Sequence, residues 1–325
     1  MKQINWGVLG TADIAKGSTI PAMMKAENCR LYGIAGRSKA KVDEYKENFG
    51  FEKAYYSYED MLEDAAIEAV YIPLPNNLHK EWVLKAAAKK KHILCEKPLS
   101  GTEAEVKEMI QACDDAGVYF MEAFAYLHSP IVKSIKKSLD SGVIGKLSFI
   151  ETTFLAPGRG LDDIRMRRDT LGGAVYDLGC YNISLILTLV GEEPSEVQAH
   201  ARFTEQAVDI FTEASFGFPS GCSASMVTGM CCAQRSDRYF IHGTEGTIEA
   251  PIQFNCEGTV SYYINKNGER EEIIIEVPNN YMLEVEQLGR CITEKEQPYV
   301  SHAFSLKNAR TMDKVLKSMG YSNNN

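Results

Sequence analysis

The chain of 325 residues has no run of about 18 apolar residues, and no basic segment leads into an apolar one at its start. Because those patterns mark membrane helices and secretory signals, we expect neither membrane insertion nor secretion. Positive charge is also scarce, since 35 lysines and arginines face 44 aspartates and glutamates and the formal net charge is -9. An acidic surface does not favour binding to phosphate backbones or anionic membranes. This argues against a nucleic-acid-binding or membrane-binding protein.

The chain also lacks the cysteine and histidine patterns of metal and redox sites. None of its nine cysteines forms a C-x-x-C pair, and its six histidines show no spacing typical of metal ligands. We therefore expect reduced thiols in a cytoplasmic protein and no bound metal. Hydrophobic residues make up 45% and charged residues 24%, which is typical of a globular protein. The length is sufficient for two domains.

Short apolar segments alternate with helical patterns over the first third of the chain. Strands are expected at 4–10, 29–36, 69–75, 92–98 and 118–124, and helices near 14–26, 39–48, 77–89 and 102–116. Alternation of this kind predicts βαβ units, and therefore a doubly wound α/β fold with a parallel sheet.

From about Leu147 the pattern changes to strands of alternating polarity, bounded by turn pairs such as NG and EG. Successive strands with few helices between them predict a mostly antiparallel sheet. One helix near 174–190 interrupts these strands, and helices at 281–293 and 303–318 close the chain. The boundary between two domains is expected within 122–146, and we assign 1–122 and 123–325 to them.

The first predicted strand runs into WGVLGTADIAKG, where Gly10, Ala12 and Ala15 lead into a helix. This is the place of the G-x-G-x-x-[GA] fingerprint, in which backbone N–H groups and a helix N-terminus approach a pyrophosphate. Ala12 replaces the second glycine, and its methyl group would crowd the phosphate slightly. Taken alone, the motif fits an ordinary strand-to-helix turn equally well.

The end of the second predicted strand, AGRSKAK, strengthens the dinucleotide interpretation. An NAD-selective site usually has a carboxylate there, whereas this chain has Arg37, Ser38 and Lys41. Two cations and a hydroxyl suit a 2′-phosphate, so NADP is favoured and NAD stays open. The alternative is that Arg37 and Lys41 form a solvated helix start.

A third segment, YIPLPNNLHKEW, ends an apolar strand at Pro73 and Pro75. Prolines remove backbone donors and leave a smooth wall against which a nicotinamide could rest. Asn76 or Asn77 could equally be a helix cap. For His79 we prefer a structural role on the next helix.

Two constellations further along the chain carry candidate chemistry. Lys97 and Glu96 stand in HILCEKPLS, at the carboxyl end of a parallel strand, where ligands bind in such sheets. Asp177 and Tyr181 stand four residues apart in TLGGAVYDLGCY, on one face of a predicted helix. A tyrosine of pKa about 10 needs a nearby cation to act near neutral pH, and Lys97 could supply it. Without the other motifs, a surface ion pair and a buried interface tyrosine explain these residues as well.

Together these motifs resemble the Gfo/Idh/MocA oxidoreductase family. The resemblance rests on the segments GTADIA, AGRS, YIPLPNNLH, CEKPLS, MEAFAYLHSP and DIRMRRDTLGGAVYDLGCY, which extend over most of residues 4–190. It is strongest for the branch of dimeric dihydrodiol dehydrogenase and glucose–fructose oxidoreductase, because Tyr181 stands where many relatives have histidine.

The resemblance implies a Rossmann domain, followed by an α/β domain with a large, open-faced sheet that often forms dimers. The C-terminal helix is a candidate to pack back on the first domain. The resemblance also implies that Lys97 lies beside the nicotinamide and that Pro98 is cis. It further implies that Asp177 and Tyr181 match the downstream catalytic pair and that His128 and Arg165 line the substrate pocket. The residues assigned to the cofactor are Gly10, Thr11, Ala12, Asp13, Ile14, Arg37, Ser38, Lys41, Pro73, Leu74, Pro75, Asn76, His79, Glu96 and Lys97. Those assigned to the substrate are Lys97, His128, Arg165, Asp177 and Tyr181.

The function expected from the resemblance is hydride transfer between nicotinamide and a carbinol or carbonyl carbon of a sugar, polyol or related cyclic alcohol. Tyr181 would be the acid/base, assisted by Lys97, in a homodimer or higher homo-oligomer. Two rivals stay open. One is a dinucleotide-binding regulator, which would have no chemical need for the set of Lys97, Asp177 and Tyr181. The other is a lyase or glycosidase that uses tightly bound NAD for transient oxidation.

Overall fold

A computed structural model describes residues 2–321 of the chain. The described residues form two compact units. Unit 1 comprises the residues up to Ala125 together with Asn279–Leu306, and unit 2 comprises Tyr126–Pro278 and the residues from Lys307 onward. The chain therefore returns to unit 1 after most of unit 2 has been built.

Unit 1 is built on a six-stranded sheet with the order β3-β2-β1-β4-β5-β6, and all its pairings are parallel. The strands are β1 (Ile4–Leu9), β2 (Cys29–Ala35), β3 (Lys53–Tyr55), β4 (Ala69–Ile72), β5 (His92–Glu96) and β6 (Phe120–Ala123). The predicted doubly wound parallel sheet is confirmed. Because the strand order reverses between β1 and β4, the crevice expected to bind a ligand lies at the carboxyl ends of these strands.

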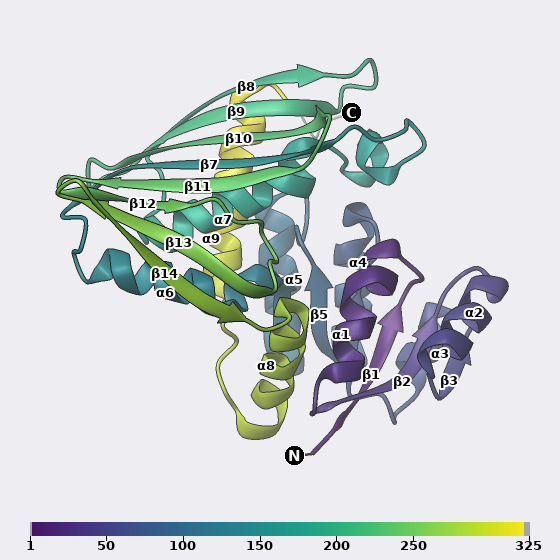
Figure 1. Ribbon diagram of the computed structural model, residues 1–325. Coiled ribbons are helices and arrows are strands. Elements are labelled where there is room, and N and C mark those ends of the chain that lie inside the picture. The colour runs from purple at the N-terminus through teal and green to yellow at the C-terminus, as the bar shows by residue number, and fades with distance from the viewer. Residues whose placement is uncertain (1, 322–325) are drawn as a thin grey trace. The chain divides into compact units, whose positions relative to one another are not determined.

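Helices of unit 1 pack in pairs beside the sheet, α1 against α8 and α4 against α5 (Figure 1). The helices are α1 (Ile20–Lys25), α2 (Lys39–Phe49), α3 (Tyr58–Glu63), α4 (His79–Ala88), α5 (Glu103–Ala116) and α8 (Asn280–Glu294). The position where α5 begins is fixed by an N-cap, since the Thr102 hydroxyl accepts the N–H of Glu105. Strand β3 and helix α3 were not predicted, because their three and six residues are too short to show a period.

Unit 2 is built on an eight-stranded sheet with the order β14-β13-β12-β11-β7-β10-β9-β8. Only β7 and β10 pair in parallel, so the predicted mostly antiparallel sheet is confirmed. The strands are β7 (Leu147–Pro157), β8 (Glu196–Phe203), β9 (Asp209–Gly217), β10 (Ser223–Cys232), β11 (Ser236–Gly243), β12 (Gly246–Ala250), β13 (Gly258–Lys266) and β14 (Glu269–Val277). The short strand β12 was not predicted.

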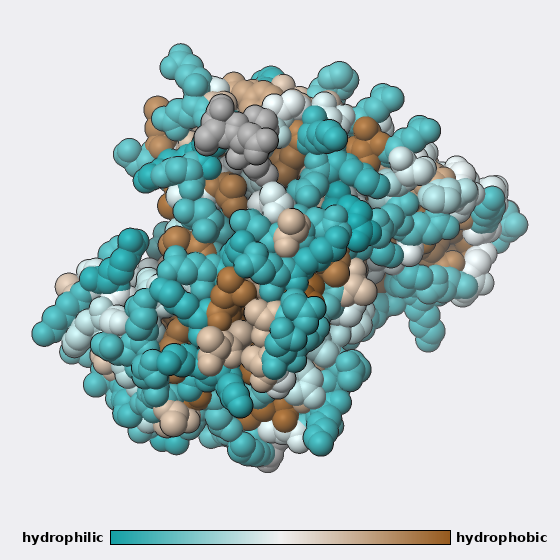
Figure 2. Space-filling view, turned by 180° about the vertical axis from the view of Figure 1, so that it is seen from behind, coloured by the Kyte–Doolittle hydropathy of each residue, from teal (hydrophilic) through white to brown (hydrophobic). Residues whose placement is uncertain are grey.

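The helices of unit 2 lie on one face of this sheet, and no helix within residues 2–321 covers the opposite face (Figure 1). They are α6 (Pro130–Asp140) and α7 (Cys180–Val190), joined by α9 (His302–Ser318), which starts in unit 1. Helix α6 was not predicted, although Ile131, Ile135 and Leu139 recur at helical spacing and are buried. The surface seen in Figure 2 is mostly hydrophilic, with apolar residues in small patches.

One helical stretch, Arg168–Val190, is long and apolar enough to span a membrane by length and composition. The stretch is not an unbroken run of apolar residues, because it contains Asp169, Asp177 and Asn182. Of its most apolar window, 83% is buried inside the fold, where it packs against β7 and β10. Burial of that kind is what the core helix of a packed domain requires.

Candidate active site

The turn after β1 has the geometry that a dinucleotide phosphate requires. Gly10 has a φ of +125°, and a Cβ atom there would lie 3.0 Å from a methyl group of Leu74. Only glycine suits both constraints. The following residues, from Asp13, are helical, so the turn presents a helix N-terminus, which attracts anions. These residues fit a pyrophosphate.

Three side chains at the carboxyl end of β2 fit a 2′-phosphate. Arg37, Ser38 and Lys41 are all exposed. Ser38 is the N-cap residue of α2, yet its hydroxyl makes no cap hydrogen bond. Arg37 lies beside the phenol of Tyr58, where its charge opposes the burial that raises the pKa of that phenol. Two cations and a hydroxyl at this position are therefore accessible to a ligand.

The structure of the loop after β4 bears on three residues whose roles were open, Asn76, Asn77 and His79. Pro75 is the residue before the helical turn Asn76–Leu78, and neither Asn76 nor Asn77 is the N-cap, so the cap interpretation is wrong. His79 is fully buried, and its two ring nitrogens lie 2.9 Å from the carbonyl oxygen of Pro98 and 2.8 Å from that of Leu74. An enclosed ring with both nitrogens so engaged cannot contact a cofactor directly. The structural role stated for His79 fits, because it joins the loop after β4 to the turn after β5.

Lys97 follows the last residue of β5, in a turn with a cis peptide bond to Pro98, as predicted. Glu96, by contrast, points into the fold and is 7% exposed. The phenol of Tyr71 donates to Oε1 of Glu96 at 2.6 Å, and the Lys97 N–H lies 3.3 Å from Oε2. Glu96 therefore anchors the backbone of Lys97, and a direct contact of its carboxylate with a cofactor stays a prediction.

Glu122 on β6 is a residue of this site that the sequence analysis missed. It pairs in register with Cys95, is 3% exposed, and its Oε1 lies 3.3 Å from the N–H of Leu99. Burial raises the pKa of Glu122 to about 7, whereas hydrogen bonds from Ser305 and Leu99 and the charge of Lys97 oppose that rise. The signal available in the sequence was a charged residue inside the apolar strand VYFMEAF, because charged residues are rarely buried without a reason.

Asp177 and Arg165 form an ion pair in unit 2. Nε of Arg165 lies 2.9 Å from Oδ2 of Asp177, and its Nη1 lies 3.3 Å from Asp163. Asp163 also caps the short helical turn Ile164–Met166, since its Oδ1 accepts the N–H of Arg165. The neighbouring carboxylates raise the pKa of Arg165, so it stays charged. The predicted pocket residues Arg165 and Asp177 are therefore brought together.

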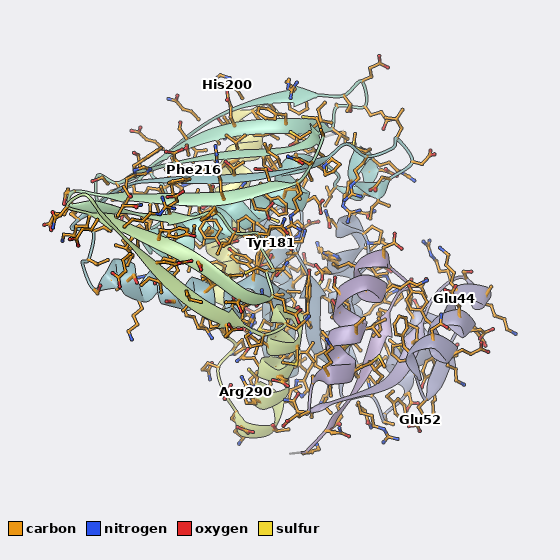
Figure 3. All side chains as sticks on the ribbon, in the orientation of Figure 1. Glu44, Glu52, Tyr181, His200, Phe216 and Arg290 are labelled. Carbon is orange, nitrogen blue, oxygen red and sulfur yellow. The ribbon has the colours of Figure 1, made fainter. Side chains whose placement is uncertain are left out.

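Tyr181 stands at the start of α7, directly after a π-helical turn over Val175–Gly179. Such turns often occur at functional sites. The ring is 9% exposed, and Figure 3 shows it beside the strands of the large sheet. Its centroid lies 5.5 Å from the ring of Tyr126, 5.5 Å from Phe154 and 5.3 Å from Phe254. Three aromatic neighbours fix its orientation.

Asn255 approaches the phenol of Tyr181, with Nδ2 3.5 Å from the hydroxyl oxygen. The loop that carries it is held by Asp237, which accepts the N–H of Phe254 at 3.0 Å and pairs with Arg235. The sequence analysis did not identify Asn255. The predicted pocket residue His128 is 3% exposed, within the interior of unit 2 before α6.

The start of the helical segment that carries Asp177 depends on Asp209, the first residue of β9. Oδ2 of Asp209 accepts the N–H of Val175 at 2.9 Å and the hydroxyl of Thr212 at 3.0 Å. A Cβ atom at Gly173, whose φ is +132°, would lie 2.0 Å from the other carboxylate oxygen. The second glycine of the GG pair therefore leaves room for this buried carboxylate. This contact was also missed.

No group of three or more His, Cys, Asp or Glu side chains that could hold a metal is found within residues 2–321. The nine cysteines are all free thiols. Lys97 and the residues assigned to the cofactor belong to unit 1, whereas Asp177 and Tyr181 belong to unit 2.

Comparison with known proteins defines the class. Residues 4–124 match the oxidoreductase family with an NAD-binding Rossmann fold, GFO/IDH/MocA, and residues 132–249 match its C-terminal domain. The chain therefore belongs to the Gfo/Idh/MocA family and is an oxidoreductase.

Several known proteins are similar over almost the whole chain. D-xylose 1-dehydrogenase (NADP(+)) 2 of Haloferax volcanii is 33% identical over 316 residues, which cover 96% of each chain. Trans-1,2-dihydrobenzene-1,2-diol dehydrogenase of Danio rerio is 28% identical, over 98% of this chain and 97% of its own. The crystal structure of a 3-ketoreductase from Actinomadura kijaniata, in complex with NADP and TDP-benzene, superposes with a TM-score of 0.93 at 27% identity and covers 98% of both chains.

Solved structures of that ketoreductase include variants in which one tyrosine is replaced by phenylalanine and one lysine by alanine or glutamate. In its chain the two replaced residues lie as many positions apart as Lys97 and Tyr181 do here.

Proposed function

We propose that this protein is an NADP-preferring dehydrogenase or reductase of a sugar, polyol or related cyclic alcohol. Bound NADP(H) supplies the hydride acceptor or donor for the carbon that bears the reacting hydroxyl or carbonyl. The Gly10 turn would hold the pyrophosphate, and Arg37, Ser38 and Lys41 the 2′-phosphate. NADP-linked relatives support this preference, and NAD stays the alternative cofactor.

Tyr181 takes the hydroxyl proton during oxidation and returns it during reduction. Lys97 places a positive charge that favours the phenolate over the phenol. Asp177, paired with Arg165, orients the substrate hydroxyl. His79 and Glu96 act on the backbone around Lys97, since their hydrogen bonds hold the turn that presents it.

The observation that carries this proposal is the setting of Tyr181. Three aromatic rings fix its phenol at the start of α7, one turn after the Asp177–Arg165 pair. The equal separation of the replaced lysine and tyrosine in the Actinomadura ketoreductase supports the same two residues here. A regulator without turnover would not require them.

The experiment compares Tyr181→Phe and Lys97→Met with matched controls Tyr263→Phe on the large sheet and Lys89→Met directly after α4. Turnover of a sugar panel is followed at 340 nm, and NADPH binding is followed by fluorescence. We expect the two site variants to lose roughly 10²–10⁴-fold in kcat with NADPH affinity retained. Near-normal turnover in both would refute the assignment. NADPH binding without turnover of any sugar in the unmodified protein would favour the regulator, and tightly retained cofactor without net absorbance change would favour the lyase or glycosidase.

We also propose that the protein forms a homodimer or higher homo-oligomer through the uncovered face of the large sheet. That face presents an aromatic cluster of Phe149, Phe240 and His242, whose rings are within contact distance and partly exposed. An apolar cluster on an open sheet face favours association. Light scattering should give at least twice the chain mass, and Phe240→Glu should lower it, whereas a monomer in both cases would refute the interface. A cytoplasmic location is proposed on the free thiols alone.

A further inference from the structure

The arginines of the segment DIRMRRD are engaged within unit 2. Arg165 pairs with Asp177 and Asp163, and Arg167 pairs with Asp169 through two hydrogen bonds. The guanidinium of Arg168 donates to the carbonyl of Ala207 at 2.7 Å and lies 4.5 Å from the ring centroid of Tyr321. This segment therefore carries three positive charges of which two are neutralised by adjacent carboxylates and one is bound to backbone and aromatic groups.

A cation beside the rings around Tyr181, Arg235, is neutralised in the same way. Arg235 lies 4.8 Å from the ring centroid of Phe154 and forms a bidentate pair with Asp237. The uncharged amide of Asn255 approaches the Tyr181 phenol. This part of unit 2 thus offers aromatic rings, a phenol and an amide, with no net positive charge.

The charge of Lys97 is also opposed within its own unit. Lys97 acts electrostatically on the buried carboxyl of Glu122. The exposed cations Arg37 and Lys41 stand at the position proposed for the 2′-phosphate of NADP. The arginines of this part of unit 2 are therefore each engaged by groups of unit 2, and Lys97 acts on a carboxyl group of unit 1.

From this pairing we infer that the substrate is an uncharged, unphosphorylated sugar or polyol, and that sugar phosphates and nucleotide-activated sugars are discriminated against. The inference rests on the proposed function and narrows it. It decides between two of the substrate classes that the names of the similar proteins suggest, free D-xylose and dTDP-linked sugars.

The physical reason is competition for the guanidinium groups. A phosphate would have to displace Asp177 or Asp163 from Arg165 and leave a partly buried carboxylate without its partner, which is costly. A neutral sugar needs only hydrogen bonds to groups such as Asp177, Asn255 and Tyr181, and aromatic rings can cover its apolar C–H face. Arg159, at the exposed tip of the loop, forms no ion pair with a described residue, and solvent screens its attraction.

The test compares matched substrates on the protein loaded with NADP(H). Oxidation of D-xylose and D-glucose is compared with that of glucose 6-phosphate, which keeps the same free anomeric hydroxyl. Binding of these three compounds and of dTDP-glucose, whose anomeric oxygen is substituted, to the NADPH complex is measured by calorimetry. We expect kcat/KM and affinity to be about tenfold or more higher for the neutral sugars, because one unpaired charge costs at least that factor. Higher affinity or kcat/KM for either charged compound would overturn the inference.

Two isosteric variants test the stated cause. Asp163→Asn removes one carboxylate from Arg165 but keeps an oxygen that can cap the Arg165 N–H. Asp162→Asn, at the exposed neighbouring position, changes the net charge equally without touching Arg165. We expect Asp163→Asn to raise glucose 6-phosphate affinity severalfold relative to glucose, and Asp162→Asn to leave this ratio unchanged. An equal effect of both variants, or none from Asp163→Asn, would refute the role of the paired arginine.

Failure of the inference and failure of the proposed function can be told apart. If no sugar is oxidised but calorimetry still favours the neutral sugars, the proposed reaction is wrong and the substrate class stands. If a charged sugar is oxidised in preference, the reaction stands and the substrate class is wrong.

Discussion

Oδ2 of Asp209 lies 2.9 Å from the backbone nitrogen of Val175, and this contact joins the large sheet to the start of the helical segment that carries Asp177 and Tyr181. Asp209 is fully buried on β9, and Thr212 donates a second hydrogen bond to the same oxygen. The position of the proposed catalytic pair therefore depends on a carboxylate that is not a member of it.

Replacing Asp209 separates this positioning role from general packing. Asp209→Ala leaves the Val175 N–H and the Thr212 hydroxyl without their acceptor, and we expect the free energy of unfolding to fall by about 2–3 kcal/mol and kcat to fall with it. Asp209→Asn retains an acceptor oxygen and should keep most of the stability and most of kcat. Denaturant unfolding and steady-state kinetics on the two variants check this. If Asp209→Asn and Asp209→Ala lowered the free energy of unfolding and kcat equally, the hydrogen-bonding role would be contradicted.

Asp209 should also make stability depend on pH. Burial raises its pKa to about 7, above the ordinary value near 4, so the folded state binds this proton more tightly than the unfolded state. The resulting contribution to stability is complete below about pH 4 and is lost as the pH rises through about 7. In that window the unmodified protein should lose stability relative to Asp209→Asn by up to about 1.4 kcal/mol per pH unit. Unfolding of both proteins across the window measures the difference. A difference independent of pH would refute the shifted pKa.

Glu122 is predicted to shape the pH dependence of catalysis. Its pKa is raised to about 7 by burial, and when ionised it favours the charged form of Lys97. The pH profile of kcat/KM should therefore contain an inflection near pH 7 that disappears in Glu122→Gln, with NADPH affinity little changed. Ser305→Ala removes a hydrogen bond that lowers this pKa, so it should move the inflection to higher pH without abolishing it. Retention of the inflection in Glu122→Gln would assign it to another group.

Cofactor choice can be tested at the end of β2. Arg37→Ala should weaken NADPH binding by about tenfold or more and NADH binding hardly at all, because a charge-assisted hydrogen bond to phosphate contributes about 1.5–3 kcal/mol. Lys39→Ala is the matched control, because it also removes one positive charge. The Lys39 ammonium lies over the ring of Tyr56, 5.2 Å from its centroid. Fluorescence titration with both cofactors measures the effect. Equal loss of NADH and NADPH affinity in Arg37→Ala would remove the 2′-phosphate assignment.

Much of this architecture could be predicted from the sequence because the controlling forces are local or periodic. Alternating apolar strands and helical patterns predicted the parallel sheet, and alternating polarity after Leu147 predicted the antiparallel one. Short elements such as β3 and β12 show too little of a period to be recognised. Helix α6 had a readable pattern and was overlooked because its segment was interpreted as a domain boundary.

The sequence by itself determined the fold class, the family and the motif residues Lys97, Asp177 and Tyr181, since these depend on patterns along the chain. Only the tertiary structure decided which residues position them. Asp209 is 34 positions from Val175, and Glu122 is 23 positions from Leu99. A contact over such distances leaves no periodic trace, because it depends on how strands from different parts of the chain align. The burial that raises the pKa of Glu122 and the carboxylates that neutralise Arg165 are likewise consequences of packing.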